Sequence, residues 1–119
     1  MAPPLPTTAI QCTILAGQSL SAPVDCSNGS PVLIVMPPDW DPAETSLISL
    51  QMSVDGGVTF YDLFHPDGTE YTMTVKPGAA VLLASQGIDW ATHIAIRSGS
   101  TAAPIPRTAD RTFTIVMTT

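Results

Sequence analysis

The sequence contains little charge, and very little of that charge is positive. Only 12% of its 119 residues are charged, which is about half the usual share for a globular domain. Ten carboxylates face four cations, for a net charge of −6. The cations are Lys76, Arg97, Arg107 and Arg111. Because nucleic acids and anionic membranes are bound mainly through clustered Lys and Arg, we expect neither a nucleic-acid partner nor a membrane partner.

Long hydrophobic runs are missing as well. Pro or polar residues interrupt every apolar stretch well short of the roughly 18 residues that a transmembrane helix requires. The first ten residues, MAPPLPTTAI, contain neither a basic region nor a continuous apolar region, so we expect no signal peptide. These features predict synthesis in the cytoplasm.

The sequence also lacks the motifs of catalysis and of cofactor binding. It contains no G-x-S-x-G, no phosphate-binding glycine loop and no paired glutamates. Its two histidines, His65 and His93, do not have the spacing of a zinc site or a catalytic triad, and we expect both at the surface. Asp55, Asp62 and Asp67 do not have the spacing of a calcium loop. We therefore expect no enzyme activity, no bound metal and no cofactor.

Pro, Gly, Ser and Thr take the place of the missing charge, while hydrophobic residues make up 45% of the chain. Pro and Gly interrupt helices, and β-branched residues favour a pleated surface. About nine short segments separated by turn signals predict an all-β fold. Specifically, residues 8–119 are expected to form a single-domain antiparallel β-sandwich with a jelly-roll or related Greek-key topology. Met1–Thr7, with three prolines, is expected to be an extended arm, with a disordered tail as the alternative.

Alternating apolar residues place the strands of the first half. Ile10–Ile14 and Leu20–Cys26 are expected to form a hairpin. Pro31–Met36 is continuously apolar, which is typical of a strand buried on both faces or covered by a loop. Ile48–Val54 is the clearest half-buried strand, with Ile48, Leu50, Met52 and Val54 pointing inward.

Turn residues then predict how the chain continues. Turns at Asp55–Gly57 and Pro66–Gly68 are expected to give a three-stranded meander. Strands are expected at Ala79–Ala84, His93–Arg97 and Thr112–Met117, with one helical turn at Gln86–Trp90. The inward side chains of the last two strands are Ile94, Ile96, Phe113, Ile115 and Met117.

The two cysteines are expected to be buried free thiols. In the expected hairpin, Cys12 faces Ala22, and Cys26 lies about 13 Å further along the strand. A disulfide needs Cα atoms within about 7 Å of each other.

The segment SVDGGVTF fits the S-x-D-x-G-x-T-[WF] pattern of an Asp-box. In this motif the Asp side chain folds back onto backbone amides, a Gly supplies a positive φ, and an aromatic residue packs beneath the turn. These roles would fall to Ser53, Asp55, Gly57, Thr59 and Phe60. We interpret the segment as a structural turn rather than a ligand site.

Three aromatic residues are candidates for contact with a ligand or partner. Trp40 and Trp90 each follow an Asp in a predicted loop, and Tyr61 follows the Asp-box. A loop tryptophan can stack on a sugar or anchor a protein contact, but it more often caps an open end of a sandwich.

Four segments together resemble small proteins encoded among the virion genes of tailed bacteriophages and prophages. The segments are LAGQSLSAPVD, VLIVMPPDW, LISLQMSVDGGVTFYDLF and IAIRSGSTAAPIPRTADRTFTIVM, and the match runs from about Ala16 to Met117. This resemblance implies a non-enzymatic virion component, such as a capsid decoration protein or the base of a head spike or fibre. Such a protein would be made in the host cytoplasm, form a homo-oligomer and dock on the phage capsid or on other virion proteins.

The surroundings of the Asp-box are also similar to galactose-binding-like and discoidin-like sandwiches. That similarity implies an alternative function, a carbohydrate-binding adhesive module that takes a host glycan on Trp40, Tyr61 or Trp90. The sequence departs from sugar-binding relatives because it lacks an evident cluster of Arg, Asn and aromatic residues at the predicted loop tips.

Overall fold

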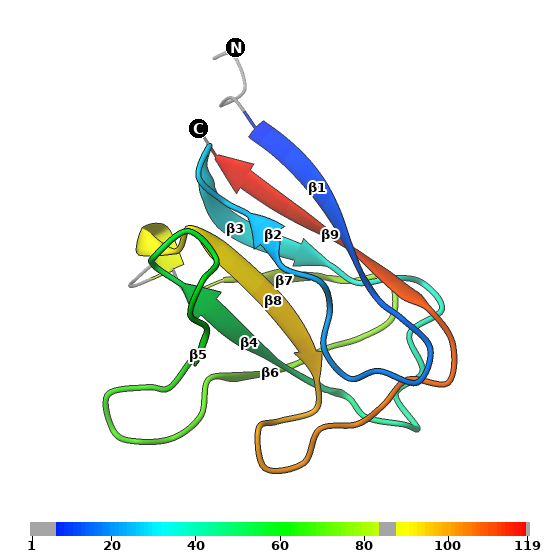
Figure 1. Ribbon diagram of the computed structural model, residues 1–119. Coiled ribbons are helices and arrows are strands. Elements are labelled where there is room, and N and C mark those ends of the chain that lie inside the picture. Colours follow the sequence, from blue (N-terminus) through cyan, green and yellow to red (C-terminus); the bar gives the residue numbers. More distant parts are fainter. Residues whose placement is uncertain (1–6, 84–87, 119) are drawn as a thin grey trace.

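Two antiparallel β-sheets pack against each other across a hydrophobic core in the computed structural model, which describes residues 7–83 and 88–118 (Figure 1). The expected β-sandwich is confirmed. The strands are β1 (Thr7–Ile14), β2 (Val24–Asp25), β3 (Ser30–Val35), β4 (Leu47–Ser53), β5 (Tyr61–Asp62), β6 (Thr72–Thr74), β7 (Ala80–Leu82), β8 (His93–Ser98) and β9 (Arg111–Thr118). A 3-10 turn, η1 (Ile88–Trp90), lies between β7 and β8.

The strand order is that of a jelly roll. One sheet, called sheet A below, has the order β1-β9-β3-β7, and the other, sheet B, has the order β2-β8-β4-β5 with β6 also paired to β4. Hydrogen-bonded pairs therefore join β1 to β9, β2 to β8, β3 to β7, and β4 to β5 and β6. A long antiparallel ribbon folded over itself produces this pairing.

Core side chains alternate along the central strands, as the sequence predicted. Burying one such large apolar side chain contributes about 1.5–3 kcal/mol to folding. The positions that were expected to point inward and are almost completely buried are Ile48, Leu50, Ile94, Ile96, Phe113, Ile115 and Met117.

The expected hairpin at Ile10–Ile14 and Leu20–Cys26 is wrong. β1 pairs along its whole length with β9, from Thr7 opposite Thr118 to Ile14 opposite Arg111, and β2 pairs with β8 in the other sheet. The segment after Ile14 does turn at Gly17, but it then crosses from sheet A to sheet B. Alternation with a period of two residues predicts which side chains of a strand are buried, but it does not predict which other strand pairs with it.

The expected meander is only partly right. β5 returns beside β4 after the Asp55–Gly57 turn, but β6 also pairs with β4 and does not add a further strand beyond β5. Between them the chain leaves the sheet in a short excursion closed by a bridge between Phe64 and Glu70. β4 therefore has β8 on one side, and β5 and β6 in succession on the other.

Some side chains in and after β4 do not face the expected way. Val54 was expected to point inward, but it is 55% exposed because it follows the end of the strand and belongs to the turn. Ser49 and Ser53, which were expected to face solvent, are completely buried. Side chains and loops from distant parts of the chain cover this side of sheet B.

The cysteines are both buried and both free, as expected. The hairpin from which that expectation was drawn is absent from the described structure, so the distance argument behind it does not apply. Burial raises the pKa of the Cys12 and Cys26 thiols to about 11, which keeps both thiols protonated at neutral pH.

Parts of some expected elements fall outside the described residues. Of the arm expected over Met1–Thr7, residues 1–6 are not described and Thr7 begins β1. Ala84 at the end of an expected strand and Gln86 at the start of the expected helical turn are also outside, while η1 supplies that turn at Ile88–Trp90. No helix within residues 7–83 and 88–118 is long and apolar enough to cross a membrane.

Candidate functional site

The Asp-box segment forms a tight turn between β4 and β5. One carboxylate oxygen of Asp55, Oδ1, accepts hydrogen bonds from Ser53 Oγ at 2.7 Å and from the backbone amides of Val58 at 3.2 Å and Thr59 at 3.0 Å. The hydrogen bond from Ser53, with those from Thr59 and Val58, lowers the pKa of Asp55 to about 2. The carboxylate is thus engaged in holding its own loop.

The same turn is tied to the strand beside it. The amide of Gly57 donates to Ser53 Oγ at 2.9 Å, and the amide of Gly56 donates to Thr92 Oγ1 at 3.1 Å. The Thr92 hydroxyl in turn donates to the carbonyl oxygen of Ser53 at 3.1 Å. Phe60, expected beneath the turn, is only partly buried. The turn therefore fastens the β4–β5 loop to the segment that leads into β8.

An ionic cluster covers the outer face of sheet B. Arg97 on β8 is almost completely buried. Its guanidinium donates to Asp62 Oδ1 at 2.5 Å, Thr101 Oγ1 at 2.8 Å and Glu70 Oε2 at 3.4 Å. The hydrogen bond from Arg97 lowers the pKa of Asp62. This cluster holds the β5–β6 excursion and the start of the β8–β9 loop against the sheet.

Sequence patterns did not indicate this role of Arg97. Register places Arg97 opposite Ser49 on the same face, and its guanidinium donates to Ser49 Oγ at 3.3 Å. A small residue on the neighbouring strand leaves room for a long side chain to lie flat. That signal exists only once the pairing of β4 with β8 is known.

A second ionic cluster closes one end of the sandwich. Arg107 is 1% exposed and lies over the Trp40 ring, 3.7 Å from its centroid. Its guanidinium pairs with Glu44 Oε2 at 3.0 Å and donates to the carbonyl oxygen of Asp41 at 3.2 Å. Burial lowers the pKa of Arg107, and the charge of Glu44 opposes that shift. The β8–β9 loop is in this way anchored to the β3–β4 loop.

Trp40 is part of this closure and is not a contact residue. It is 2% exposed, its indole N–H donates to the carbonyl oxygen of Thr45 at 3.1 Å, and its ring packs edge-on against Phe113 at 5.5 Å between centroids. A sugar or a partner cannot reach it in this fold. The interpretation of Trp40 as a stacking platform is therefore corrected, and the capping role is the observed one.

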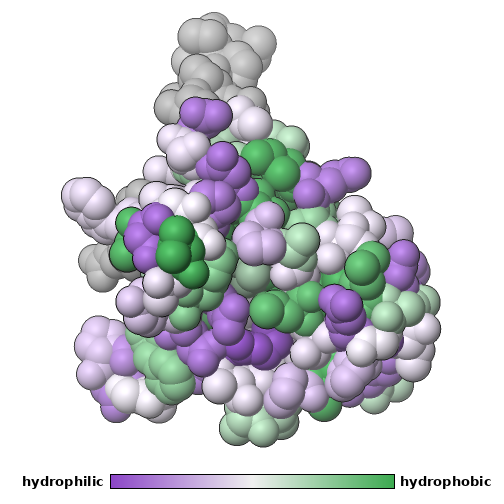
Figure 2. Space-filling view, viewed as in Figure 1, coloured by the Kyte–Doolittle hydropathy of each residue, from purple (hydrophilic) through white to green (hydrophobic). Residues whose placement is uncertain are grey.

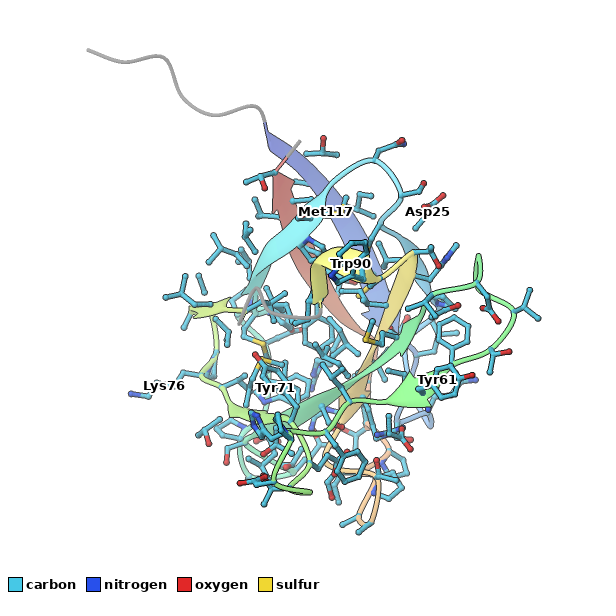
Figure 3. All side chains as sticks on the ribbon, turned by 90° about the vertical axis from the view of Figure 1, so that its left-hand side faces the viewer. Asp25, Tyr61, Tyr71, Lys76, Trp90 and Met117 are labelled. Atoms are coloured by element: carbon cyan, nitrogen blue, oxygen red, sulfur yellow. The ribbon has the colours of Figure 1, made fainter. Side chains whose placement is uncertain are left out.

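Nearly all of the positive charge is used internally. Arg97 and Arg107 are held in the two clusters, and Arg111 pairs with Asp39 at 3.3 Å. Across the described residues, Lys76 is the one cation without an ion pair, and Figure 3 shows its side chain extending away from the molecule. The surface keeps several exposed carboxylates, namely Asp25, Asp41, Asp55, Asp67 and Asp110.

The three aspartates considered for calcium lie in separate interactions. Asp55 serves the Asp-box turn, Asp62 pairs with Arg97, and Asp67 accepts from the Thr69 hydroxyl at 2.6 Å and the Thr69 amide at 2.9 Å. In the part of the chain that the structure describes, no three His, Cys, Asp or Glu side chains are placed to hold one metal ion.

The other two aromatic candidates are exposed and lie apart. Trp90 in η1 is 79% exposed and Tyr61 in β5 is 57% exposed. Figure 3 shows the two rings on different parts of the surface. Figure 2 likewise shows hydrophobic residues in several separate patches on the face that it presents. Trp90 and Tyr61 therefore do not form one aromatic platform.

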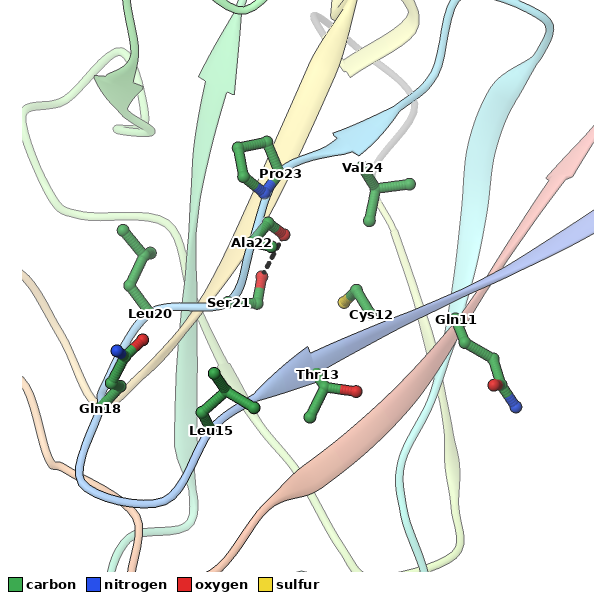
Figure 4. A pocket seen from close by; sticks show the side chains of 10 residues that line it. All are labelled: Gln11, Cys12, Thr13, Leu15, Gln18, Leu20, Ser21, Ala22, Pro23 and Val24. Carbon is green, nitrogen blue, oxygen red and sulfur yellow. Dashed lines mark hydrogen bonds between the residues drawn. The ribbon is translucent and has the colours of Figure 1, made fainter.

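A groove of about 560 Å³ lies between β1 and the crossing segment that leads to β2 (Figure 4). Its lining carries no charge and comprises Gln11, Cys12, Thr13, Leu15, Gln18, Leu20, Ser21, Ala22, Pro23 and Val24. The Ser21 hydroxyl is already engaged, because it accepts from the amide of Ile96 at 2.9 Å and donates to the carbonyl oxygen of Ala22 at 3.0 Å. This groove was not predicted, because the expected hairpin would have placed paired strands in the space that the groove occupies.

Comparison of the chain with protein-family models, with curated proteins and with solved structures finds no match. The basis for a functional proposal is accordingly the geometry described above together with the sequence patterns.

Proposed function

We propose that this chain is a non-enzymatic structural protein of a tailed-bacteriophage virion. It would act as a capsid decoration protein or as the base of a head spike or fibre, and it would dock on the particle as an oligomer. The resemblance of its four sequence segments to small virion proteins suggests this class. The jelly roll is compatible with it, since the fold occurs in viral capsid domains as well as in lectins.

The observation that carries the proposal is the distribution of polar and apolar side chains. The buried arginines Arg97 and Arg107 hold loops in place, whereas large apolar side chains such as Trp90 and Leu82 are each 79% exposed. Apolar and weakly polar surface loses little hydration energy when it is covered by another protein. This distribution supports a role in packing against neighbours.

The acidic surface supports a partner of opposite charge. With most cations engaged internally, the exposed carboxylates would meet a basic patch on a capsid or other virion protein. Many copies on a regular lattice make weak single contacts collectively strong.

The test is binding to particles of the phage whose genome encodes the chain. Purified chain is mixed with particles that lack it, the particles are sedimented, and the bound copies are counted by quantitative mass spectrometry. We expect saturable binding that weakens as salt concentration rises, because salt screens attraction between opposite charges. Absence of the chain from native particles, together with no saturable binding, would contradict the proposal.

The exposure of Trp90 and Tyr61 favours a second candidate, a carbohydrate-binding adhesive module. A glycan array probed with the purified chain separates the two functions. Saturable binding to one sugar class that is lost in Trp90→Ala or Tyr61→Ala, and kept in the exposed control Phe64→Ala, would support this candidate. Silence on the array together with particle binding would support the leading proposal.

A further inference from the structure

The chain contains a single asparagine, and a glycine follows it directly. Asn28 and Gly29 lie in the connection from β2 to β3, which carries the chain from sheet B to sheet A beside the end of β9 (Figure 1). Asparagine is one of the thermally labile residues of proteins. The backbone nitrogen of the next residue can attack its side-chain amide, and glycine hinders that attack least because it has no side chain. This pair is therefore a candidate for chemical modification.

The structure explains why a glycine stands after Asn28. A Cβ at Gly29 would lie 2.8 Å from the carbonyl oxygen of Thr118 and 3.2 Å from the Cβ of Met117. Both atoms belong to β9, and Thr118 pairs with Ser30 at the start of β3. A side chain at this position would push the two strands apart. The fold thus requires, next to the asparagine, the residue that gives the amide the least steric protection.

The Asn28 side chain is exposed and unpaired. It lies in the turn that follows β2, and in the described part of the chain its amide makes no hydrogen bond. The preceding residue is held firmly, because Asp25 Oδ1 accepts from the Ser27 amide at 2.8 Å and from the Ser27 hydroxyl at 2.6 Å. The Gly29 amide donates to the carbonyl oxygen of Cys26 at 3.3 Å, which is long for such a bond. The amide is thus open to solvent, and the neighbouring nitrogen is only weakly engaged.

Two Asp-Gly pairs provide an internal comparison, because aspartate reacts through the same kind of ring. The hydrogen bonds that the Asp55 carboxylate accepts, that from Ser53 above all, lower its pKa to about 2. Hydrogen bonds from the hydroxyl and the amide of Thr69 lower the pKa of Asp67. At pH 7 a carboxyl with a pKa of about 2 is protonated in about one molecule in 10⁵. An ionised carboxylate is a poor target for a nucleophile, so the fold protects both aspartates and leaves Asn28 unprotected.

We propose that Asn28 is a site of spontaneous deamidation. The Gly29 backbone nitrogen loses its proton to solvent and attacks Asn28 Cγ, which closes a succinimide ring. The side-chain nitrogen Nδ2 takes up a proton from water and leaves as ammonia. Because the two groups belong to adjacent residues, the reaction is intramolecular and needs no second molecule to bring them together. Water then adds to one of the two ring carbonyls, and the products are aspartate or isoaspartate according to which carbon–nitrogen bond breaks.

The isoaspartate product changes the length of the connection between β2 and β3. Its main chain runs through Cβ and Cγ of the former asparagine and is one carbon longer. Gly29 has no free space against Thr118, so the longer chain should disturb the pairing of Ser30 with Thr118 at the start of β3. Both products add a carboxylate, which makes the net charge of −6 one unit more negative. Only isoaspartate alters the backbone, so we expect it to be the destabilising product.

Incubation of the folded chain in water enriched in oxygen-18 tests the proposal. Each succinimide that opens takes up one oxygen atom from water, so proteolysis and tandem mass spectrometry compare Asn28, Asp55 and Asp67 in one sample. We expect label at Asn28 to appear at least about tenfold faster than at either aspartate, because the aspartates are ionised. Labelling should be faster at mildly alkaline than at neutral pH, since the Gly29 nitrogen must lose its proton. Electron-transfer fragmentation distinguishes isoaspartate from aspartate.

Two variants serve as matched controls. Asn28→Gln keeps an exposed amide but would have to close a larger ring, which forms more slowly, and we expect no label at this position. Asn28→Asp carries the charge of the products on a normal backbone, so it separates the effect of charge from that of the longer main chain. After incubation we expect the melting temperature of the wild type to fall, whereas that of Asn28→Gln stays constant. Circular dichroism measures both.

A folded chain that takes up no label at Asn28 would overturn the inference, and labelling of the same residue in urea would then show that the fold protects it. Equal labelling of Asn28, Asp55 and Asp67 in the folded chain would overturn it as well. These measurements use the purified chain without particles or glycans. Their outcome is therefore independent of the proposed function.

Discussion

Gly57 illustrates how closely single residues are matched to their surroundings in the β4–β5 loop. Its φ of +89° lies in the left-handed region, and a Cβ at this position would lie 3.3 Å from ring atoms of His93. The neighbouring Gly56 has a φ of +81°, but a Cβ there would meet nothing within 4 Å. Both positions therefore have a left-handed backbone that would strain any residue with a Cβ, but only at Gly57 would that Cβ also crowd a neighbouring side chain.

This difference predicts unequal costs for two otherwise identical substitutions. Gly56→Ala should lower the free energy of unfolding by about 1–2 kcal/mol, which is the usual cost of a left-handed non-glycine residue. Gly57→Ala should cost more, because the His93 ring must also move. Urea unfolding followed by fluorescence measures both values. In a His93→Ala background the two costs should converge, and equal costs in the wild-type background would contradict the assignment.

Asp55 predicts a pH dependence at the same scale. Its pKa is about 2 in the folded chain and near 3.8 when the group is free of its hydrogen bonds. A carboxyl whose pKa is lowered by folding stabilises the fold above the unfolded pKa, and that contribution is lost as pH falls through the folded pKa. Asp55→Asn should therefore lower the melting temperature at pH 7. The difference from wild type should shrink between about pH 4 and pH 2, and a difference that is constant over this range would contradict the role of the carboxylate.

At the scale of elements, the loops at one end of the sandwich are joined by buried charge. Arg107 of the β8–β9 loop pairs with Glu44 of the β3–β4 loop and lies on Trp40. The backbone of Arg107 also bonds the β1–β2 crossing, since the amide of Gly17 donates to its carbonyl oxygen at 2.7 Å and its own amide donates to that of Gln18 at 2.9 Å. One residue therefore links three loops that are far apart in sequence.

Removing the partner of this buried charge should be costly. Glu44→Gln leaves the buried Arg107 guanidinium without its ion-pair partner, and we expect a loss of about 3–5 kcal/mol in the free energy of unfolding. The control is Asp39→Asn, which removes an exposed partner of Arg111 and should cost at most about 1 kcal/mol. Urea unfolding of both variants gives the comparison, and similar costs would show that burial does not set the strength of these pairs.

At the scale of the whole molecule, the fold depends on contacts between distant parts of the chain. β1 pairs with β9, so Thr7 lies opposite Thr118, and β2 pairs with β8. β3 pairs with β7 as well, so these three pairs of the jelly-roll ribbon all join strands that are not consecutive in the chain. Such non-local pairing must overcome the entropy of closing large loops before its contacts form.

The topology therefore predicts slow folding. We expect a refolding time in the range of about milliseconds to seconds, as for other β-sandwiches, and not the microseconds of small helical domains. Stopped-flow fluorescence after dilution from urea measures this time, because Trp40 moves from water into a buried site. Refolding complete within microseconds would contradict the long-range pairing of β1 with β9.

The alternation of apolar residues was enough to predict the central strands and most of their core side chains. Ile94, Ile96, Phe113 and Ile115 are buried where period two placed them, because alternation along a strand is a local property of the backbone. The turn chemistry of the β4–β5 loop is equally local, since Asp55 bonds amides within four residues of itself.

Only the tertiary structure decided which strands are neighbours, and with them the surfaces that face outward. Ile14 could have met Leu20 across a short turn, but pairing with Arg111 gives β1 a full-length partner and closes the sandwich. Burial of Ser49 depends on Arg97, 48 residues away. The outward row formed by Ala9, Val116, Leu33 and Leu82 likewise exists only because β1, β9, β3 and β7 lie side by side. A local pattern encodes burial, whereas the choice of neighbour depends on the free energy of all long-range contacts formed together.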